Sequence, residues 1–302
     1  MIEEELEIAC NAITNRLVGI PKIIYLNHED DVEKNEYMQN QFKSWGISNF
    51  SRYRKIYRED NYDDWKHLVL DKELVQSPSE LALTLNTLQS IIDWYDSNES
   101  ETCIFMEDII KFDIVNNWFF NWDLLTKNLP YNWDCIQLFS SAERRIKMHL
   151  HPWESDSGSC HCYMITRYFA KRIKHYHYRN GKFLLHYTTP DKSIPNFEYG
   201  GLHNFFYDIG ITYTLPIFSL NEKFIGSDTV NDLVDKLSSE ATEYWWNVRS
   251  KSYSAFEFFH YNKNDEWRSI IEKIMNIQKK GIEQKSKKIL KKRIILNNLP
   301  AY

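Results

Sequence analysis

The sequence predicts an α/β protein with a mainly parallel sheet, flanking helices and a helical carboxyl-terminal extension. Short apolar runs that end in polar residues recur along the chain, and such runs are typical of buried parallel strands. The stretches between them carry apolar residues at three- and four-residue spacing, which predicts amphipathic helices. Strands that alternate with helices imply parallel strands joined by right-handed crossovers. No linker rich in Pro, Gly or Ser separates the two halves.

The first part of the chain predicts two helices and two strands. A helix is expected over residues 2–17, and a buried strand over residues 22–27. Residues 32–45 place their apolar side chains on one side, and Gly46 follows, as glycine commonly does at the end of a helix. A second strand is expected near residues 50–57.

The middle of the chain continues the alternation. The segment Ser77–Glu80 opens a helix that is expected to reach residue 95, because proline and an acidic residue favour the first helical turn. The apolar run over residues 103–106 predicts the next buried strand. A further helix is expected around residues 116–128.

The rest of the chain predicts fewer regular elements. Strands are expected over residues 134–138 and 159–165, and an amphipathic helix over residues 166–176. Beyond these, the sequence is aromatic and less periodic, with a helix expected near residues 202–208 and a short strand over residues 212–216.

Length and charge suggest one large domain and a basic tail. The chain has 302 residues and a net charge of −5, and we expect an α/β domain over residues 1–270 and a basic helical tail over residues 271–302. Residues 279–293 are strongly basic. Such a tail could contact an anionic membrane surface or nucleic acid, or form a solvated terminal helix. Because the rest of the chain is acidic, nucleic acid is the least favoured partner.

Several classes of protein are disfavoured by composition. The chain has 9 glycines and neither a GxGxxG nor a GxxxxGK[ST] motif, which counts against Rossmann dehydrogenases and P-loop NTPases. Its 5 cysteines form no CxxC pair and suit a reducing compartment. The first ten residues are acidic, unlike a secretory signal, and no apolar stretch approaches the ~18 residues of a membrane span. We therefore expect a cytoplasmic protein.

The pair Glu107-Asp108 is the strongest candidate site in the sequence. It ends a predicted strand, and open α/β sheets bind ligands in the crevice outside the carboxyl ends of their strands. Carboxylates there suit a divalent cation that also binds the phosphates of a substrate. An acidic pair that caps a loop is the simpler alternative.

Several segments, taken in order, resemble glycosyltransferase family 25, which includes lipooligosaccharide sugar transferases and collagen galactosyltransferases. The acidic hallmark of that family resembles Met106-Glu107-Asp108-Ile109. Over roughly residues 22–228, the other matching segments are Ile23–Asn27, Gly46–Arg52, Ser79–Ala82, Trp133–Leu138, Ser159–Arg167, Tyr213–Phe218 and Gly226-Ser227.

The resemblance implies a GT-A-like fold and a hexosyltransferase, of the kind that acts in lipopolysaccharide biosynthesis. The donor would be a nucleotide sugar, UDP-galactose or UDP-glucose, and the acceptor a glycan or a hydroxylated side chain. The implied cofactor is a divalent metal, Mn or Mg. Either stereochemical outcome, inverting or retaining, stays open.

The resemblance also implies roles for individual residues. Metal binding falls to Asp108 and Glu107, and donor binding to Leu26, Asn27, Arg52, Ser79 and Glu107. Asn27 could contact the base or ribose, and Arg52 the diphosphate. The catalytic candidates are Asp108, Asp208 and His203. For Asn27 and Arg52, a turn residue and a solvated arginine are the alternatives.

Three departures from the family pattern favour a second hypothesis. Ile109 stands where the family usually has a third acid, Asn86-Thr87 replaces a frequent Ser-His pair, and the segment 203–207 lacks a frequent acid. Each departure removes a polar group that the family would place near the donor or acceptor. The alternative function is therefore a catalytically impaired module that binds a nucleotide sugar or glycan without transfer.

Overall fold

The computed structural model describes residues 16–70, 77–142, 146–154, 157–185, 210–226 and 229–259. The chain divides into two units, residues 1–260 and 261–302, and the described residues belong to the first. Most of the helix expected over residues 2–17 lies outside the described residues, as do the helix at 202–208, the basic tail and the candidates His203 and Asp208.

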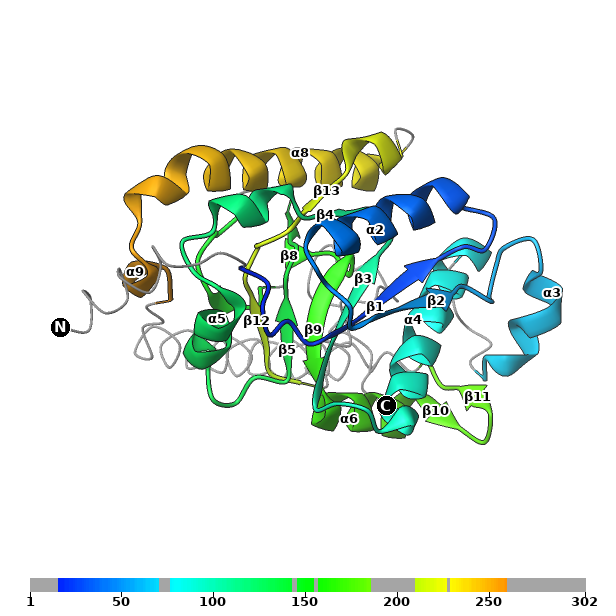
Figure 1. The fold of residues 1–302 in the computed structure, drawn as a ribbon. Coiled ribbons are helices and arrows are strands. Elements are labelled where there is room, and N and C mark those ends of the chain that lie inside the picture. The colour runs from blue at the N-terminus through cyan, green and yellow to red at the C-terminus, as the bar shows by residue number, and fades with distance from the viewer. Residues whose placement is uncertain are drawn as a thin grey trace, which may run out of the picture. The chain divides into compact units, whose positions relative to one another are not determined.

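A seven-stranded sheet forms the centre of the first unit, in the order β2-β1-β3-β9-β5-β12-β7 (Figure 1). Its strands are β1 (Lys22–Asn27), β2 (Phe50–Arg54), β3 (Thr102–Glu107), β5 (Cys135–Gln137), β7 (His151–Pro152), β9 (Cys162–Thr166) and β12 (Thr212–Thr214). The parallel pairings join β1 to β2, β1 to β3 and β5 to β12. The prediction of an α/β fold with a mainly parallel sheet is confirmed.

Two strands depart from the expected pattern of parallel crossovers, and one of them is β7, which runs antiparallel to β12. Strand β9 runs antiparallel to both of its neighbours, β3 and β5. The described residues between β5 and β9 form only short strands, including β6 (Ser141–Ala142) and β8 (Ser157–Gly158), and no helix. Parallel strands need a long crossover, usually a helix, whereas a chain that returns without one can pair antiparallel. The amino-terminal end of β9 therefore lies at the edge of the sheet where β3 ends.

Helices cover both faces of the sheet (Figure 1). Helices α4 (Pro78–Ser97) and α6 (Arg167–His177) lie side by side on one face, and α2 (Val32–Ser44) lies on the other. Ser77 and Glu80 close a capping box at the start of α4, which explains where that helix begins. The core under α4 and α6 collects alternate strand residues, including Ile24, Leu26, Cys103, Phe105, Tyr163 and Ile165.

The opposite face of the sheet has an aromatic core. Tyr25 of β1 contacts Phe42 of α2, with ring centroids 5.4 Å apart, and Phe42 also contacts Phe112. Trp118 and Trp246 are fully buried, with ring centroids 6.3 Å apart. These tryptophans are core residues.

The remaining elements are short, apart from α8 (Val230–Tyr244). They are α3 (Tyr62–Trp65), η1 (Lys66–Leu68), β4 (Ile110–Lys111), η2 (Asp113–Asn117), α5 (Trp122–Asn128), β10 (Tyr178–Arg179), β11 (Lys182–Phe183), β13 (Ser219–Leu220), η3 (Glu222–Phe224), the π-turn η4 (Trp245–Arg249), η5 (Ser250–Ser252) and α9 (Ala255–Phe259). The single helix expected around residues 116–128 is thus two, because Asn121 caps a new helix.

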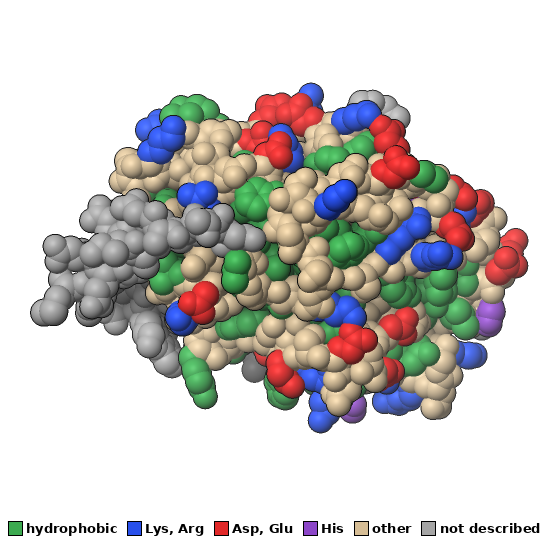
Figure 2. Space-filling view, viewed as in Figure 1, with side chains coloured by type: hydrophobic (Ala, Val, Ile, Leu, Met, Phe, Trp, Pro, Cys, Tyr) green, Lys and Arg blue, Asp and Glu red, His purple; other side chains and the backbone are tan. Residues whose placement is uncertain are grey.

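The surface of the described part carries charges of both signs. Lys or Arg and Asp or Glu side chains are interspersed over the face that carries α2 and α8 (Figure 2). In the described ranges, no helix is long and apolar enough to span a bilayer.

Candidate functional site

The carboxyl ends of three neighbouring parallel strands meet at one edge of the sheet. Strands β2, β1 and β3 are adjacent in that order, and register pairs Leu26 with Glu107 and Asn27 with Arg54. The residues that follow each strand, Lys55 and Asp108 among them, therefore lie next to one another. Ligands of open α/β sheets bind outside this edge.

Asn27 and Asp108 form a buried polar pair at the ends of β1 and β3. The Asn27 side-chain amide donates to Asp108 Oδ2 at 2.7 Å and to the Asp31 carbonyl oxygen at 3.2 Å. Both residues are buried, at 0% and 4% exposure. Because the amide nitrogen is turned to these acceptors, the Asn27 side-chain oxygen faces elsewhere, and it has no hydrogen-bond partner among the described residues. A buried acceptor without a partner is costly, by about 1–3 kcal/mol.

The surroundings of Asp108 disfavour its ionised form. Burial, and then the negative charge of Glu107, raise the pKa of Asp108 above its ordinary value, although Lys55 and the hydrogen bond from Asn27 act in the opposite direction. A carboxyl with a raised pKa is better suited to accept and release a proton near neutral pH than an ordinary one.

Lys55 and Glu107 form an ion pair across the end of β1. Lys55 Nζ lies 2.6 Å from Glu107 Oε2, and the two side chains are only 12% and 13% exposed. The Lys55 backbone amide donates to the Asn27 carbonyl oxygen at 3.0 Å, which places the lysine directly beyond β2. Burial acts to lower the pKa of Lys55, but Glu107 and Asp108 outweigh it, so the pKa is raised and the side chain stays a cation.

A turn brings the two acids to the same site although neighbouring strand residues point oppositely. Glu107 is the last residue of β3, and Asp108 and Ile109 form the turn that follows it. The Glu107 side chain reaches Lys55, and the Asp108 side chain reaches Asn27. The acidic pair is therefore divided between two different partners.

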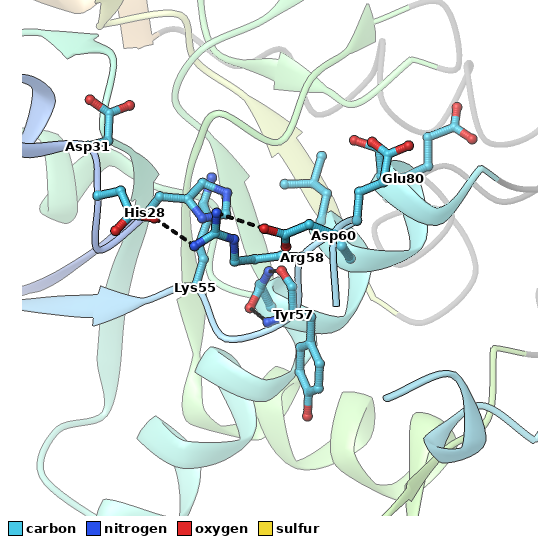
Figure 3. Close-up of a pocket in the computed structure, with 13 residues that line it drawn as sticks. His28, Asp31, Lys55, Tyr57, Arg58, Asp60 and Glu80 are labelled. Atoms are coloured by element: carbon cyan, nitrogen blue, oxygen red, sulfur yellow. Dashed lines mark hydrogen bonds and ion pairs between the residues drawn. The ribbon is translucent and has the colours of Figure 1, made fainter. Parts of the chain in front are cut away.

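A cavity of about 760 Å³ opens beside this cluster (Figure 3). It is lined by residues that follow β1 and β2 and by the first turns of α4: His28, Asp30, Asp31, Lys55, Tyr57, Arg58, Glu59, Asp60, Ser79, Glu80, Ala82, Leu83 and Asn86. Its size lies within the range of small-molecule sites, about 300–1,000 Å³.

Most charges of the cavity wall have partners within the protein. Arg58 lies between Asp30 and Asp60, at 2.7 Å and 3.0 Å, and Figure 3 shows its guanidinium directed at Asp60. Asp31 caps α2 and lies 2.9 Å from Lys34 Nζ. Burial, followed by the charges of Lys55 and Arg58, lowers the pKa of His28, which favours its neutral form.

Asn86 shapes the wall of the cavity. Its side-chain oxygen accepts from the backbone amides of Ile56 and Tyr57, at 2.9 Å and 3.1 Å, and its amide donates to the Tyr57 carbonyl oxygen at 2.8 Å. Asn86 is 1% exposed. The sequence indicated a lost polar group here; the structure instead shows a buried amide that fixes the loop after β2.

The structure brings some of the predicted site residues together and sets others apart. Asn27, Glu107 and Asp108 meet at the sheet edge, and Ser79 lines the cavity. The Leu26 side chain belongs to the core under α4.

Arg52 acts on the backbone rather than on the cavity wall. Its guanidinium donates to the carbonyl oxygens of His28 and Glu29, at 2.8 Å and 3.3 Å, and so supports the loop after β1. Its role in binding a diphosphate stays a prediction.

Sequence reasoning missed a second charged pair at the same edge. His161 Nε2 lies 2.9 Å from Asp235 Oδ2 of α8, and the His161 carbonyl oxygen accepts from the Glu107 backbone amide at 2.8 Å. The sequence favoured a core strand for Cys160-His161-Cys162, but β9 begins only at Cys162. Burial acts to lower the pKa of His161, and the hydrogen bond to Asp235 outweighs it and raises that pKa.

The side chains at the end of β3 do not fit the divalent metal that the family resemblance implies. The Lys55 ammonium lies against the Glu107 carboxylate, where it would repel a second cation. Asp108 is hydrogen-bonded to Asn27, and Ile109 offers no side-chain oxygen. Within the described ranges, no three His, Cys, Asp or Glu side chains form a group that could hold a metal.

Comparisons with known proteins give weak structural similarities and no family. No family model and no curated protein matches the chain. HddC from Yersinia pseudotuberculosis complexed with GMP-PN aligns at 9% identity over 75% of this chain and 100% of that chain, with a TM-score of 0.31. A second structure of HddC from Yersinia pseudotuberculosis aligns at 12% identity over 67% of this chain and 73% of that chain, with a TM-score of 0.27. Similarity at this level carries no argument about fold or function.

Proposed function

We propose that this protein is a hexosyltransferase that uses a nucleotide sugar, UDP-galactose or UDP-glucose, and transfers the hexose to a glycan or a hydroxylated acceptor. The observation that carries the proposal is the Asn27–Asp108 pair at the ends of two parallel strands, beside a cavity of about 760 Å³. The motif resemblance to glycosyltransferase family 25 supports the same conclusion from the sequence.

The cavity offers complementary groups for a nucleoside. Asn27 does not line the cavity: its side-chain oxygen is buried, and the residue instead holds Asp31 and Lys55 of the wall through hydrogen bonds. Ribose and hexose hydroxyls are donors, and carboxylates such as Glu59 and Asp60 on the wall can accept from them. Ser79 lies at the start of α4 and adds a hydroxyl to the same wall.

The raised pKa of Asp108 supports its assignment as the base of the transfer step. In that step the acceptor oxygen bonds to C1 of the hexose, the bond from C1 to the diphosphate oxygen breaks, and the nucleoside diphosphate leaves with the bonding electrons. The acceptor hydroxyl loses its proton, and a carboxylate with a raised pKa is a suitable base. His203 and Asp208 stay predictions for acceptor binding or activation.

Donor hydrolysis and transfer test this function. The purified chain is incubated with UDP-galactose or UDP-glucose and a panel of saccharide acceptors, and released UDP is measured. We expect Asp108→Asn to lower the release about 10²–10⁴-fold while UDP still binds. Unchanged release from Asp108→Asn would remove Asp108 from the mechanism, and the absence of release from the unaltered chain would contradict transferase activity.

A second candidate function is a module that binds a nucleotide sugar or glycan without transferring it. The burial of Asp108 to 4% exposure and its hydrogen bond to Asn27 favour a structural role for this carboxyl. Calorimetry with UDP and with UDP-hexose distinguishes the two functions. Binding without turnover supports the module, and turnover supports the enzyme.

A further inference from the structure

We propose that the ammonium group of Lys55 takes the place of a divalent cation at this site and binds the diphosphate of the nucleotide directly. This inference rests on the proposed function for the identity of the ligand. The structural observation behind the inference, a buried lysine at the ends of three strands, does not depend on that function.

Lys55 lies where the ends of three strands meet the cavity. It follows β2 directly, its ammonium crosses the end of β1 to reach Glu107 at the end of β3, and it lines the cavity. Ligand phosphates in open α/β sheets lie outside these same strand ends. A cation at this place meets the diphosphate of any nucleotide that fills the cavity.

Glu107 uses only part of the hydrogen-bonding capacity of the Lys55 ammonium. An ammonium group has three donors, and Glu107 is its one side-chain partner among the described residues. Two N–H groups are therefore left for phosphate oxygens. Lysine binds phosphate as a compact point charge in other folds.

The charged groups of the cavity wall are mostly acids. Five acids line the wall, and four of them already have partners. Asp30 and Asp60 form ion pairs with Arg58, Asp31 forms one with Lys34, and Glu80 belongs to the capping box of α4. Glu59 is the fifth. Arg58 and Lys34 supply two positive charges against these four acids, and the partners of Glu80 are neutral, so the wall keeps a net negative charge. The Lys55 ammonium is the buried cation that a diphosphate meets at the strand ends.

Glu107 has a positioning role in this arrangement. In a metal site it would hold the cation through its oxygens, and here it holds the Lys55 ammonium at 2.6 Å. The lysine accordingly supplies the positive charge that offsets the charge growing on the leaving diphosphate, which is the task of the metal in metal-dependent transferases. Metal-independent binding of the nucleotide follows.

Calorimetry with inorganic diphosphate, UDP and uridine tests the inference. All titrations are made in EDTA, and the UDP titration is repeated with Mn²⁺ in place of EDTA. We expect diphosphate and UDP to bind in EDTA, and uridine to bind more weakly than UDP. Mn²⁺ should change the Kd of UDP by less than about threefold, which is well below the roughly tenfold change in Kd that the loss of one charged contact produces. Lys55→Met should raise the Kd for diphosphate about ten- to hundredfold, and Lys55→Arg should retain much of the affinity.

Two further variants keep the test decisive. Lys55→Met leaves Glu107 buried without its cation and can unfold the site, so the double variant Lys55→Met with Glu107→Gln is compared with Glu107→Gln alone, after circular dichroism shows that both fold. Lys127→Met is the matched control, since Lys127 forms a 2.6 Å pair with Asp123 on α5 and should bind diphosphate like the unaltered chain.

The outcomes separate this inference from the proposed function. A UDP complex that forms only with Mn²⁺, or equal diphosphate affinity with and without Lys55, overturns the role of Lys55. That role is also overturned if diphosphate and UDP bind neither in EDTA nor with Mn²⁺. Lysine-dependent diphosphate binding without hexose release from any UDP-hexose supports the inference and contradicts the transferase.

Discussion

The side-chain amide of Asn27 donates a 2.7 Å hydrogen bond to the carboxylate of Asp108, and this contact joins the ends of two neighbouring parallel strands. Asn27 belongs to β1, and Asp108 follows β3 by one residue. The pair is buried, so its polar groups were removed from water when the chain folded. The hydrogen bond offsets only part of the cost of this burial, because the Asn27 side-chain oxygen has no partner among the described residues.

The first prediction is that Asp108→Asn stabilises the protein at neutral pH. A carboxyl whose pKa is raised by folding contributes stability that is full below its ordinary pKa and is lost as the pH rises through the raised pKa. Removing the ionisable group removes that loss, while the new side chain can still accept from Asn27. We expect Tm to rise by about 2–4 °C at pH 7 and the gain to shrink towards pH 4.

Thermal unfolding followed by circular dichroism between pH 4 and pH 8 measures this effect. Asp113→Asn is the control, because Asp113 is 73% exposed and its neutralisation should not shift Tm with the same pH dependence. A lower Tm for Asp108→Asn at pH 7 would show that the buried carboxylate stabilises the fold.

The second prediction concerns the hydrogen bonds of Asn86. Asn86→Ala removes three hydrogen bonds to the loop after β2 and leaves the buried backbone groups of Tyr57 without these partners. We expect a loss of about 2–4 kcal/mol in the free energy of unfolding and weaker binding of UDP. Urea denaturation and calorimetry give the two quantities.

Gln89→Ala is the matched control for Asn86. It lies one turn further along α4, and its side chain makes an exposed hydrogen bond to Asp93. Its effect should stay within about 0.5 kcal/mol. Equal effects of the two substitutions would mean that the side-chain hydrogen bonds of Asn86 do not stabilise the loop.

The order and type of the elements up to β5 could largely be predicted from the sequence, because buried strands and amphipathic helices have different periods. Strand β1 runs over Lys22–Asn27 as expected, and α2 ends one residue before its expected end. The direction of β9 could not be predicted, because direction depends on the connection between strands rather than on their pattern.

The site was predicted where a strand end was located correctly and missed where it was not. The ends of β1 and β3 identified Asn27, Glu107 and Asp108. The second strand was expected to reach residue 57, but β2 ends at Arg54, so Lys55 was not considered as a residue beyond a strand end. His161 and Asp235 of α8 are 74 positions apart in the sequence, so no local sequence pattern predicts their contact.

The third prediction separates the two arginines of β2. Arg52 supports the backbone of His28 and Glu29, whereas Arg54 forms an ion pair with Glu29 in which both side chains are about two-thirds exposed, at 64% and 65%. Arg52→Met should therefore lower the free energy of unfolding by about 1–3 kcal/mol and raise the Kd for UDP. Arg54→Met should cost no more than about 0.5 kcal/mol. Urea denaturation of both variants, with UDP titrations, makes the comparison, and a larger effect from Arg54 would show that the loop after β1 does not depend on Arg52.

The fourth prediction is a pH-dependent contact between His161, which precedes β9, and α8. Asp235 raises the pKa of His161, so the pair stabilises the fold fully below the ordinary His pKa of about 6.5, and that stability is lost as the pH rises through the raised pKa. Asp235→Asn should therefore cost about 1–3 kcal/mol at pH 6 and progressively less towards pH 9. Urea denaturation across this pH range measures the change in the free energy of unfolding. Glu240→Gln, at an exposed position on the same helix, should cause a change that does not vary with pH. A cost that does not vary with pH would mean that Asp235 holds a neutral imidazole, and the charge on His161 would then have no part in fixing α8 beside Glu107.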